Sequence, residues 1–159
     1  MKNLKNYLDY LKIGIEKLDL LKLQRIEDII FKKIKENKKI FVCGNGGSAS
    51  VANHFLCDFN KGIKLSSKNK LKPKIVSLSD NMETVLAVAN DISFNKIFSF
   101  QLDNYYTKGD IVIVLSCSGS SLNIMDILDY CKKNKIFTIS FTGFAKKNNQ
   151  KKANLNLNL

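Results

Sequence analysis

The chain has 159 residues, of which 26 are Lys or Arg and 14 are Asp or Glu, giving a formal net charge of +12 at pH 7. This length predicts one domain with a hydrophobic core of its own, and the lack of any run of about 18 apolar residues argues against a membrane-spanning helix. Arg25 is the only arginine, and neither an RNA-binding signature nor an aromatic platform accompanies the lysines. We therefore interpret the charge as a solvated lysine surface and expect neither a nucleic-acid nor a membrane partner.

The N-terminal residues and the cysteines indicate a cellular compartment. Residues 1–12 are charged and amphipathic and lack the apolar centre of a signal peptide. The cysteines lie in apolar segments without C-x-x-C spacing, which is typical of reduced thiols in a cytoplasmic protein. These cysteines are Cys43, Cys57, Cys117 and Cys131.

Apolar residues recur at helical spacing from residue 3 to residue 37. This pattern predicts either one long helix or two helices that separate near Gly14 or Asp19. A leading amphipathic segment of this kind often packs against another subunit, so we expect a protein that is not a monomer. We accordingly divide the chain into an N-terminal helical segment, 1–37, and a domain, 38–159.

The rest of the chain alternates short apolar runs with amphipathic stretches. Ser48 is a suitable N-cap for the helix that follows the first strand, and a lysine-rich polar loop is predicted at 61–72. The alternation predicts a three-layer α/β sandwich, in which a five-stranded parallel sheet has helices on both faces and the N-terminal helix precedes it. The predicted strands are 40–43, 74–78, 111–115, 136–141 and 153–159, and the predicted helices are 49–60, 81–89, 94–106 and 122–134.

A glycine-rich turn joins the first strand to its helix. Gly44, Gly46 and Gly47 let a ligand approach the backbone closely, and the free N–H groups of a helix N-terminus favour an anion. The turn has three interpretations: an ordinary tight turn, a dinucleotide fingerprint or a sugar-phosphate site. The fingerprint requires an acidic residue about 20 positions further on. There the chain has lysines and serines, and its first acid near a strand end is Asp80.

A second candidate loop follows the third strand. Residues 116–121 place hydroxyl and thiol side chains around Gly119, directly before an amphipathic helix. A serine-rich linker is the alternative, but a linker is not expected between a buried strand and a helix. Open α/β sheets bind ligands at the carboxyl ends of their strands, so the loop predicts a phosphate- or hydroxyl-binding site.

Further short motifs accompany the glycine turn and the serine loop. In chain order the motifs are Gly44-Asn45-Gly46-Gly47-Ser48, His54, Ala89-Asn90-Asp91, Ser116-x-Ser118-Gly119-x-Ser121 and Thr142-Gly143. Together they resemble the sugar isomerase (SIS) domain family, and within it the phosphoheptose isomerases, over nearly the whole chain from residue 3. The resemblance implies a flavodoxin-like fold and a homotetramer with active sites at subunit interfaces. It also implies isomerisation of sedoheptulose 7-phosphate to D-glycero-D-manno-heptose 7-phosphate, for the synthesis of heptose, lipopolysaccharide or capsule.

The resemblance further implies roles for individual residues. Asp58 would be the catalytic base and His54 a polarising acid, and the same two side chains would bind Zn²⁺ in members that carry this metal. No nucleotide cofactor is implied. The implied phosphosugar-binding residues are Asn45, Gly46, Gly47 and Ser48 at the glycine turn, Asn90 and Asp91 after the second strand, and Ser116, Cys117, Ser118 and Ser121 around the phosphate.

The sequence departs from the family pattern in two respects that bear on catalysis. The family has glutamate where this chain has Asp58, whose side chain is shorter by about 1.5 Å. The family also continues past the fifth strand into a helix with a glutamine and a histidine, whereas this sequence ends at Leu159, so we expect a C-terminally truncated form. Because isomerisation through an enediol needs both a base and an acid, the alternative is a non-catalytic SIS module. Such a module either binds phosphosugars and acts as a regulator, or binds a protein partner and acts as a scaffold for a replication initiator.

Overall fold

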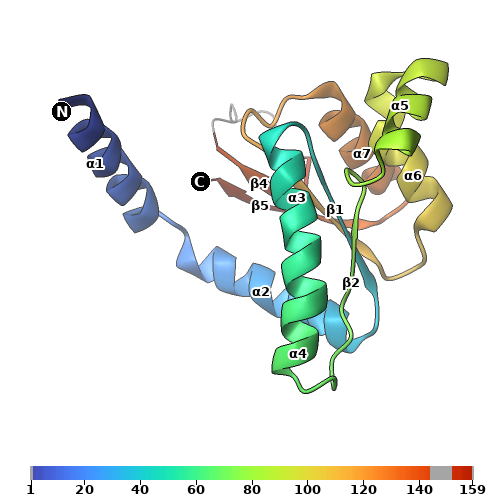
Figure 1. Ribbon diagram of the computed structural model, residues 1–159, viewed down its shortest axis with the longest axis horizontal. Coiled ribbons are helices and arrows are strands. Elements are labelled where there is room, and N and C mark those ends of the chain that lie inside the picture. Colours follow the sequence, from blue (N-terminus) through green and yellow to red (C-terminus); the bar gives the residue numbers. More distant parts are fainter. Residues whose placement is uncertain (1, 144–151, 159) are drawn as a thin grey trace.

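A five-stranded parallel sheet forms the centre of the molecule. The computed structural model describes residues 2–143 and 152–158. The strands lie in the order β2-β1-β3-β4-β5, and every neighbouring pair is parallel. Helices cover both faces of the sheet (Figure 1), so the expected three-layer α/β sandwich is confirmed. The strands are β1 (Lys39–Gly44), β2 (Lys74–Ser77), β3 (Ile111–Ser116), β4 (Phe137–Thr142) and β5 (Leu155–Asn158).

The helices divide between the two faces of the sheet. α5, α6 and α7 pack over a core that includes Phe41 and Cys43, whereas α2 and α3 pack over Ile40 and Val42 on the opposite face. Alternate residues of β1 thus enter different cores, as the period of two in a strand requires. No helix within the described residues is long and apolar enough to cross a membrane. The helices are α1 (Lys2–Glu16), α2 (Leu20–Lys35), α3 (Gly47–Cys57), α4 (Lys64–Ser66), α5 (Met82–Asp91), α6 (Ile97–Tyr105) and α7 (Leu122–Lys133).

The N-terminal segment forms two helices that separate near Asp19, one of the two positions that the apolar pattern suggested. The Asp19 carboxylate caps α2 by accepting a hydrogen bond from the Lys22 N–H at 2.9 Å. α2 then packs against the sheet, whereas α1 extends away from it (Figure 1). The apolar stripe of α1 is exposed, and its members are Leu4, Leu8, Leu11 and Ile15.

Ser48 does not cap α3, contrary to the prediction. The helix begins two residues earlier than predicted, at Gly47, and no side chain caps it. Gly46 has a φ of +53°, in the left-handed region that favours glycine. This conformation turns the chain so that the Asn45 carbonyl accepts a hydrogen bond from the Ser48 N–H at 2.9 Å. The glycine backbone, rather than a capping hydroxyl, therefore sets the start of the helix.

The predicted polar loop at 61–72 is wrong for its first residues, because the helix continues. α3 passes through a π-helical segment, Asp58–Ile63, into the short α4. Phe55, Phe59 and Ile63 follow one another at intervals of four and pack against the core beneath α3. The rings of Phe55 and Phe59 stack with their centroids 3.9 Å apart. Burying these side chains offsets the cost of about 1 kcal/mol that Gly62 adds to the helix.

β1 ends in close contact with the helix that follows it. Gly44 is buried, and a Cβ atom added to it would lie 2.6 Å from the Cβ atom of Ser48. The same added atom would lie 2.8 Å from the Ser48 carbonyl carbon and oxygen. Carbon atoms do not approach so closely without displacement, so position 44 accommodates only glycine.

Gly44→Ala should therefore lower the free energy of unfolding by about 1 to 3 kcal/mol, the usual cost of overpacking. Urea unfolding followed by circular dichroism measures the change. Gly62→Ala is the matched control, because nothing lies within 4 Å of a Cβ atom at that helical position. The control should be neutral or slightly stabilising. Equal stability of Gly44→Ala and the wild type would contradict the contact.

Candidate functional site

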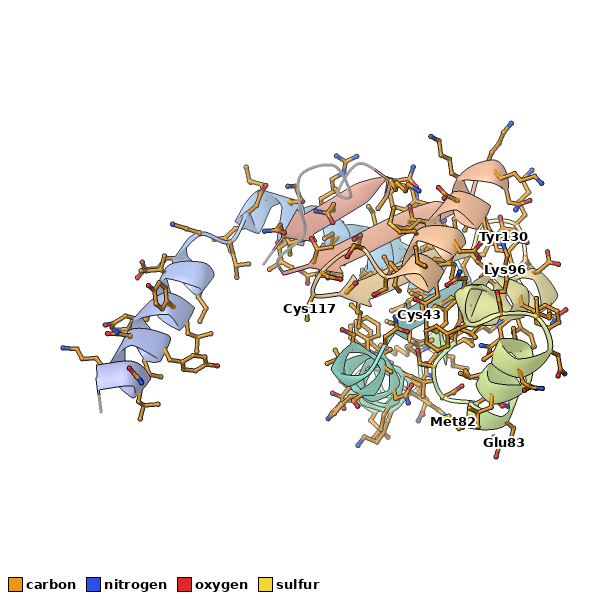
Figure 2. The ribbon with its side chains drawn as sticks, turned by 90° about the horizontal axis from the view of Figure 1, so that it is seen from above. Cys43, Met82, Glu83, Lys96, Cys117 and Tyr130 are labelled. Atoms are coloured by element: carbon orange, nitrogen blue, oxygen red, sulfur yellow. The ribbon has the colours of Figure 1, made fainter. Side chains whose placement is uncertain are left out.

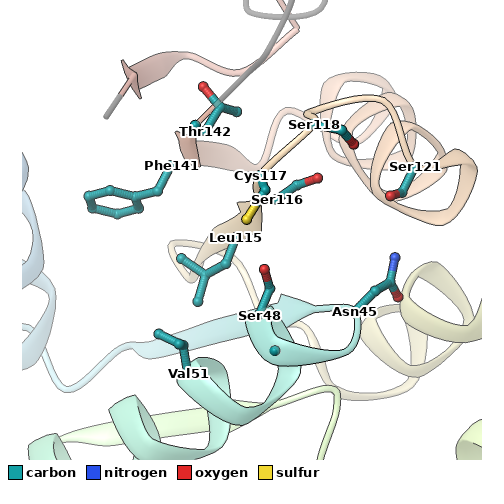
Figure 3. A pocket seen from close by; sticks show the side chains of 12 residues that line it. Asn45, Ser48, Val51, Leu115, Ser116, Cys117, Ser118, Ser121, Phe141 and Thr142 are labelled. Atoms are coloured by element: carbon teal, nitrogen blue, oxygen red, sulfur yellow. The ribbon is translucent and has the colours of Figure 1, made fainter. Parts of the chain in front are cut away.

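The carboxyl ends of β1, β3 and β4 surround a cavity of about 640 Å³. Because these strands are parallel, the loops that follow them meet at one edge of the sheet. The cavity thus lies between the glycine turn after β1 and the serine loop, residues 116–121, after β3 (Figure 3). The predicted binding residues that line it are Asn45, Gly47, Ser48, Ser116, Cys117, Ser118 and Ser121.

Internal hydrogen bonds hold the serine loop in shape. The buried Ser116 hydroxyl accepts a bond from the Gly119 N–H at 3.1 Å, and the Ser118 hydroxyl accepts one from the Ser120 N–H at 3.3 Å. Ser121 precedes α7, and its side chain makes no capping bond. The Ser121 hydroxyl and the first N–H groups of α7 are therefore left to bind a ligand, and a helix N-terminus favours an anion.

Ser79, in the turn after β2, holds the glycine turn in place. Its hydroxyl accepts a hydrogen bond from the Gly44 N–H at 3.2 Å and donates one to the Gly44 carbonyl at 3.0 Å. The Ser79 N–H donates to the hydroxyl of Ser77, which in turn donates to the Asn53 carboxamide at 2.6 Å. These bonds join β2, β1 and α3 beside the cavity, and the sequence analysis assigned no such role to either serine.

Asn45 is paired with a residue that the sequence analysis missed. Asn123 is buried in the first turn of α7. Its carboxamide donates to Asn45 Oδ1 at 2.8 Å and accepts from Asn45 Nδ2 at 2.8 Å. In the sequence, Asn123 resembles any polar residue near a helix start, and only its contact with Asn45, 78 residues away, reveals its role.

An apolar wall and the turn after β4 complete the cavity. The Gly143 N–H donates to the Cys117 carbonyl at 3.1 Å, which ties the turn after β4 to the serine loop. The apolar residues of the wall were expected only as members of a strand or helix. The lining residues that were not predicted to bind a ligand are Val51, Leu115, Phe141, Thr142 and Gly143.

Three predicted binding residues lie outside the cavity lining. Gly46 shapes the turn without lining the cavity. Asn90 and Asp91 are exposed in the last turn of α5, where the Asn90 amide donates to the Asp91 carboxylate at 2.8 Å. The structure does not bring them to the cavity, so their contact with a substrate stays a prediction.

The predicted acid–base pair also lies outside the cavity lining, at the end of α3. His54 Nδ1 lies 2.9 Å from a carboxylate oxygen of Asp58, and the two side chains are 74% and 58% exposed. Within residues 2–143 and 152–158, no group of three His, Cys, Asp or Glu side chains is placed to hold a metal ion. A zinc site needs at least three protein ligands. The described residues therefore do not fit zinc, and the roles of His54 and Asp58 stay predictions.

The cavity offers hydrogen-bond donors rather than acid–base groups. Its described lining contains serine and threonine hydroxyls, one carboxamide and backbone N–H groups, which suit the oxygens of a phosphate or a sugar. The same lining contains no carboxylate, imidazole or ammonium group, and its titratable side chain is the Cys117 thiol. The geometry therefore supports binding of a polar anion more directly than it supports chemistry on it.

Residues 6–143 match the family model of the SIS domain. The chain belongs to the SIS domain family. This SIS domain is 35% identical to a phosphoheptose isomerase of Thermodesulfovibrio yellowstonii, over 80% of this chain and 61% of that protein. It is 34% identical to a probable phosphoheptose isomerase of Thermoplasma acidophilum, over 79% and 68% of the respective chains. The chain thus spans roughly three fifths to two thirds of the length of these relatives.

A solved structure shows the same fold for the SIS domain. The phosphoheptose isomerase of Neisseria gonorrhoeae superposes with a TM-score of 0.78 at 24% sequence identity. The superposition covers 99% of this chain and 82% of that one. At this identity the likeness establishes the arrangement of the sheet and its helices, including the helices that precede β1.

The cysteines of this SIS domain lie in two environments, and all of them are free. Burial raises the pKa of the Cys43 thiol well above its usual range and that of Cys131 to about 12. Cys57 and Cys117 are exposed. Because the thiolate is the nucleophile, the buried thiols should be unreactive in the folded protein.

At about pH 8 we expect the exposed pair, Cys57 and Cys117, to react quickly with Ellman's reagent. All four cysteines should react after unfolding in guanidinium. Absorbance of the released thiolate counts the reactive groups. Cys57→Ser should leave the cavity thiol, Cys117, as the fast group. A fast reaction of every cysteine without denaturant would mean that Cys43 and Cys131 are not buried as described.

Proposed function

We propose that this chain binds a phosphorylated sugar in the cavity at the ends of β1, β3 and β4 and interconverts its ketose and aldose forms. The proposed reaction is sedoheptulose 7-phosphate to D-glycero-D-manno-heptose 7-phosphate, in the cytoplasm, as a step towards heptose for lipopolysaccharide or capsule. The observation that supports binding is the meeting of the glycine turn and the serine loop across one cavity. The names of the relatives at 35% and 34% identity support the choice of heptose.

The proposal places the phosphate at the serine loop. Ser118 and Ser121 line the cavity there, and the N-terminus of α7 adds N–H donors and the positive end of its dipole. Hydrogen bonds to a charged acceptor are stronger than neutral ones. The sugar hydroxyls then extend towards the glycine turn, where the Asn45 carboxamide both donates and accepts.

The acid–base groups of the proposal are Asp58 and His54. Isomerisation through an enediol requires a base that moves a proton between neighbouring carbons and an acid that polarises the carbonyl oxygen. His54 and Asp58 follow Val51 at spacings of three and seven and so share its face of α3. Because Val51 lines the cavity, a bound sugar that extends along this face approaches the pair. We assign Asp58 the proton transfer and His54 the polarisation.

A homotetramer is the second part of the proposal. His54 and Asp58 are exposed, and an acid–base pair is more effective when water is excluded from it. A neighbouring copy that covers α3 would enclose the pair. A zinc ion held by His54 and Asp58 would need at least one further protein ligand, and we derive no step through a metal.

A non-catalytic SIS module is the alternative, and one observation favours it. The described cavity lining holds no carboxylate or imidazole, so the cavity itself is built for binding. In such a module the phosphosugar would act as a signal, or the surface would bind a protein partner. The two candidates share the phosphate site and differ in whether Asp58 matters.

Replacing Ser118 and Ser121 together by alanine should remove most of the rise in melting temperature that sedoheptulose 7-phosphate causes. A bound ligand stabilises the native state by mass action, and the double variant loses the hydroxyl donors. Differential scanning fluorimetry measures the shift. Ser120→Ala is the matched control, because this serine belongs to the same loop but does not line the cavity. If the double variant responds like the control, the phosphate does not bind at this loop.

Asp58→Asn should lower kcat for sedoheptulose 7-phosphate by about 10²- to 10⁴-fold, the usual contribution of general acid–base catalysis. Its ligand-induced shift in melting temperature should be largely kept, because asparagine preserves the shape of the Asp58 side chain and the proposed phosphate donors lie at the serine loop. Asp129→Asn is the matched control, since Asp129 is equally exposed, at 58%, and also ion-paired. Binding without turnover in the wild type would establish the non-catalytic module in place of the isomerase.

Light scattering should show a tetramer for the purified protein, because the exposed apolar stripe of α1 requires a covering surface. Leu4→Lys with Leu8→Lys should reduce the mass towards that of a monomer. Leu65→Lys, on α4, is the control, since Leu65 and Leu4 are both 64% exposed. A monomeric wild type at micromolar concentration would refute the assembly.

A further inference from the structure

The carboxamides of Asn45 and Asn123 form a reciprocal pair. Each donates one N–H to the other's oxygen, and both bonds are 2.8 Å long. A carboxamide has two N–H donors and two acceptor lone pairs. The pairing therefore uses half of the capacity of Asn45 and leaves one donor and one acceptor for another molecule.

The two members of the pair have different surroundings. Asn123 is 1% exposed, and among the described residues its side chain hydrogen-bonds to Asn45. Asn45 is half-buried and lines the cavity (Figure 3). A buried amide that lost its partner would remain unsatisfied, at a cost that favours the paired arrangement. The Asn45 side chain is therefore held in one place before any ligand arrives.

The pair also connects the two halves of the proposed site. Asn45 belongs to the glycine turn after β1, whereas Asn123 is the second residue of α7, which follows the serine loop after β3. The bonds thus fix the position of the sugar-binding amide relative to the phosphate-binding hydroxyls of Ser118 and Ser121. This span has to match the distance between the phosphate and the hydroxyl groups of the bound sugar.

We propose that Asn123 is a positioning residue that makes the cavity select phosphosugars over inorganic phosphate. It does not touch the ligand. It holds the Asn45 carboxamide at a set distance from the serine loop. A phosphosugar is long enough to contact the carboxamide and the loop together, whereas a free phosphate is not. The inference rests on the proposed function, because it requires a phosphosugar in this cavity.

The test compares two probes, sedoheptulose 7-phosphate and inorganic phosphate, by isothermal titration calorimetry. Asn123→Leu keeps the approximate volume of the side chain and removes both hydrogen bonds. We expect this substitution to lower the affinity for sedoheptulose 7-phosphate by about tenfold, the value of one good hydrogen bond. The affinity for inorganic phosphate should stay unchanged. In an Asn45→Ala background, Asn123→Leu should have no further effect on either probe.

A second variant and a control separate positioning from stability. Asn123→Asp keeps the size of the side chain and can still accept one bond from Asn45, but it places a carboxylate oxygen against Asn45 Oδ1. This variant should therefore lose the same selectivity. It provides the test if Asn123→Leu folds poorly. Asn60→Leu is the matched control. The Asn60 amide also makes two bonds, to the N–H and carbonyl of Ile75 at 3.0 Å, and Asn60 does not line the cavity. The control should lower the melting temperature without changing the ratio of the two affinities.

The outcomes distinguish the inference from the function on which it rests. A wild type that binds sedoheptulose 7-phosphate no more tightly than inorganic phosphate overturns both. A selective wild type with equally selective Asn123 variants overturns the positioning role alone. If the Asn123 variants lose affinity for both probes in parallel, and Asn60→Leu does the same, Asn123 is a purely structural residue. This outcome also overturns the positioning role.

Discussion

Gly44 lies against the backbone of Ser48 with no space for a side chain, and the Ser79 hydroxyl bonds to both its N–H and its carbonyl. This contact brings the end of β1 under the first turn of α3. The N–H groups of that turn and the Asn45 side chain then face the serine loop across the cavity. A wider separation of strand and helix would move one wall of the cavity and break the match between its two loops. The binding edge of the sheet depends on this close packing more than on any polar contact within the cavity.

The donor groups and the acid–base groups lie in different environments. The serine loop and the Asn45 pair are fixed by hydrogen bonds inside one chain, so the cavity is pre-organised. His54 and Asp58 are paired but exposed on α3. The view from above shows the labelled Cys117 at the edge of the sheet and Cys43 nearer the middle of the molecule (Figure 2). Under the proposed function, binding would therefore need only this chain, whereas efficient chemistry would need a neighbouring copy that covers α3.

Much of the architecture follows from periodicity in the sequence. β3 is an unbroken apolar run because both of its faces are buried, and the glycine turn and the serine loop interrupt the pattern where the sheet ends. Both loops of the candidate site were therefore predictable. Other features depend on contacts that periodicity does not encode. The start of α3 depends on the φ of Gly46, the extension of that helix depends on stacked rings beneath it, and Asn123 has its role only through a loop 78 residues away.

The α1 helix has 15 residues and is therefore about 22 Å long at 1.5 Å per residue. An isolated helix of this length is only marginally stable in water, and the apolar stripe of α1 is exposed in the single chain. If copies associate through this stripe, as proposed, the order of α1 would be thermodynamically linked to association, since part of the contact energy would be consumed in ordering the helix. The cavity is built entirely from residues 45–143 and does not include α1. In the proposed assembly, dilution would loosen α1 first and leave the proposed phosphate site intact, so an element that depends on concentration would be separate from one that does not.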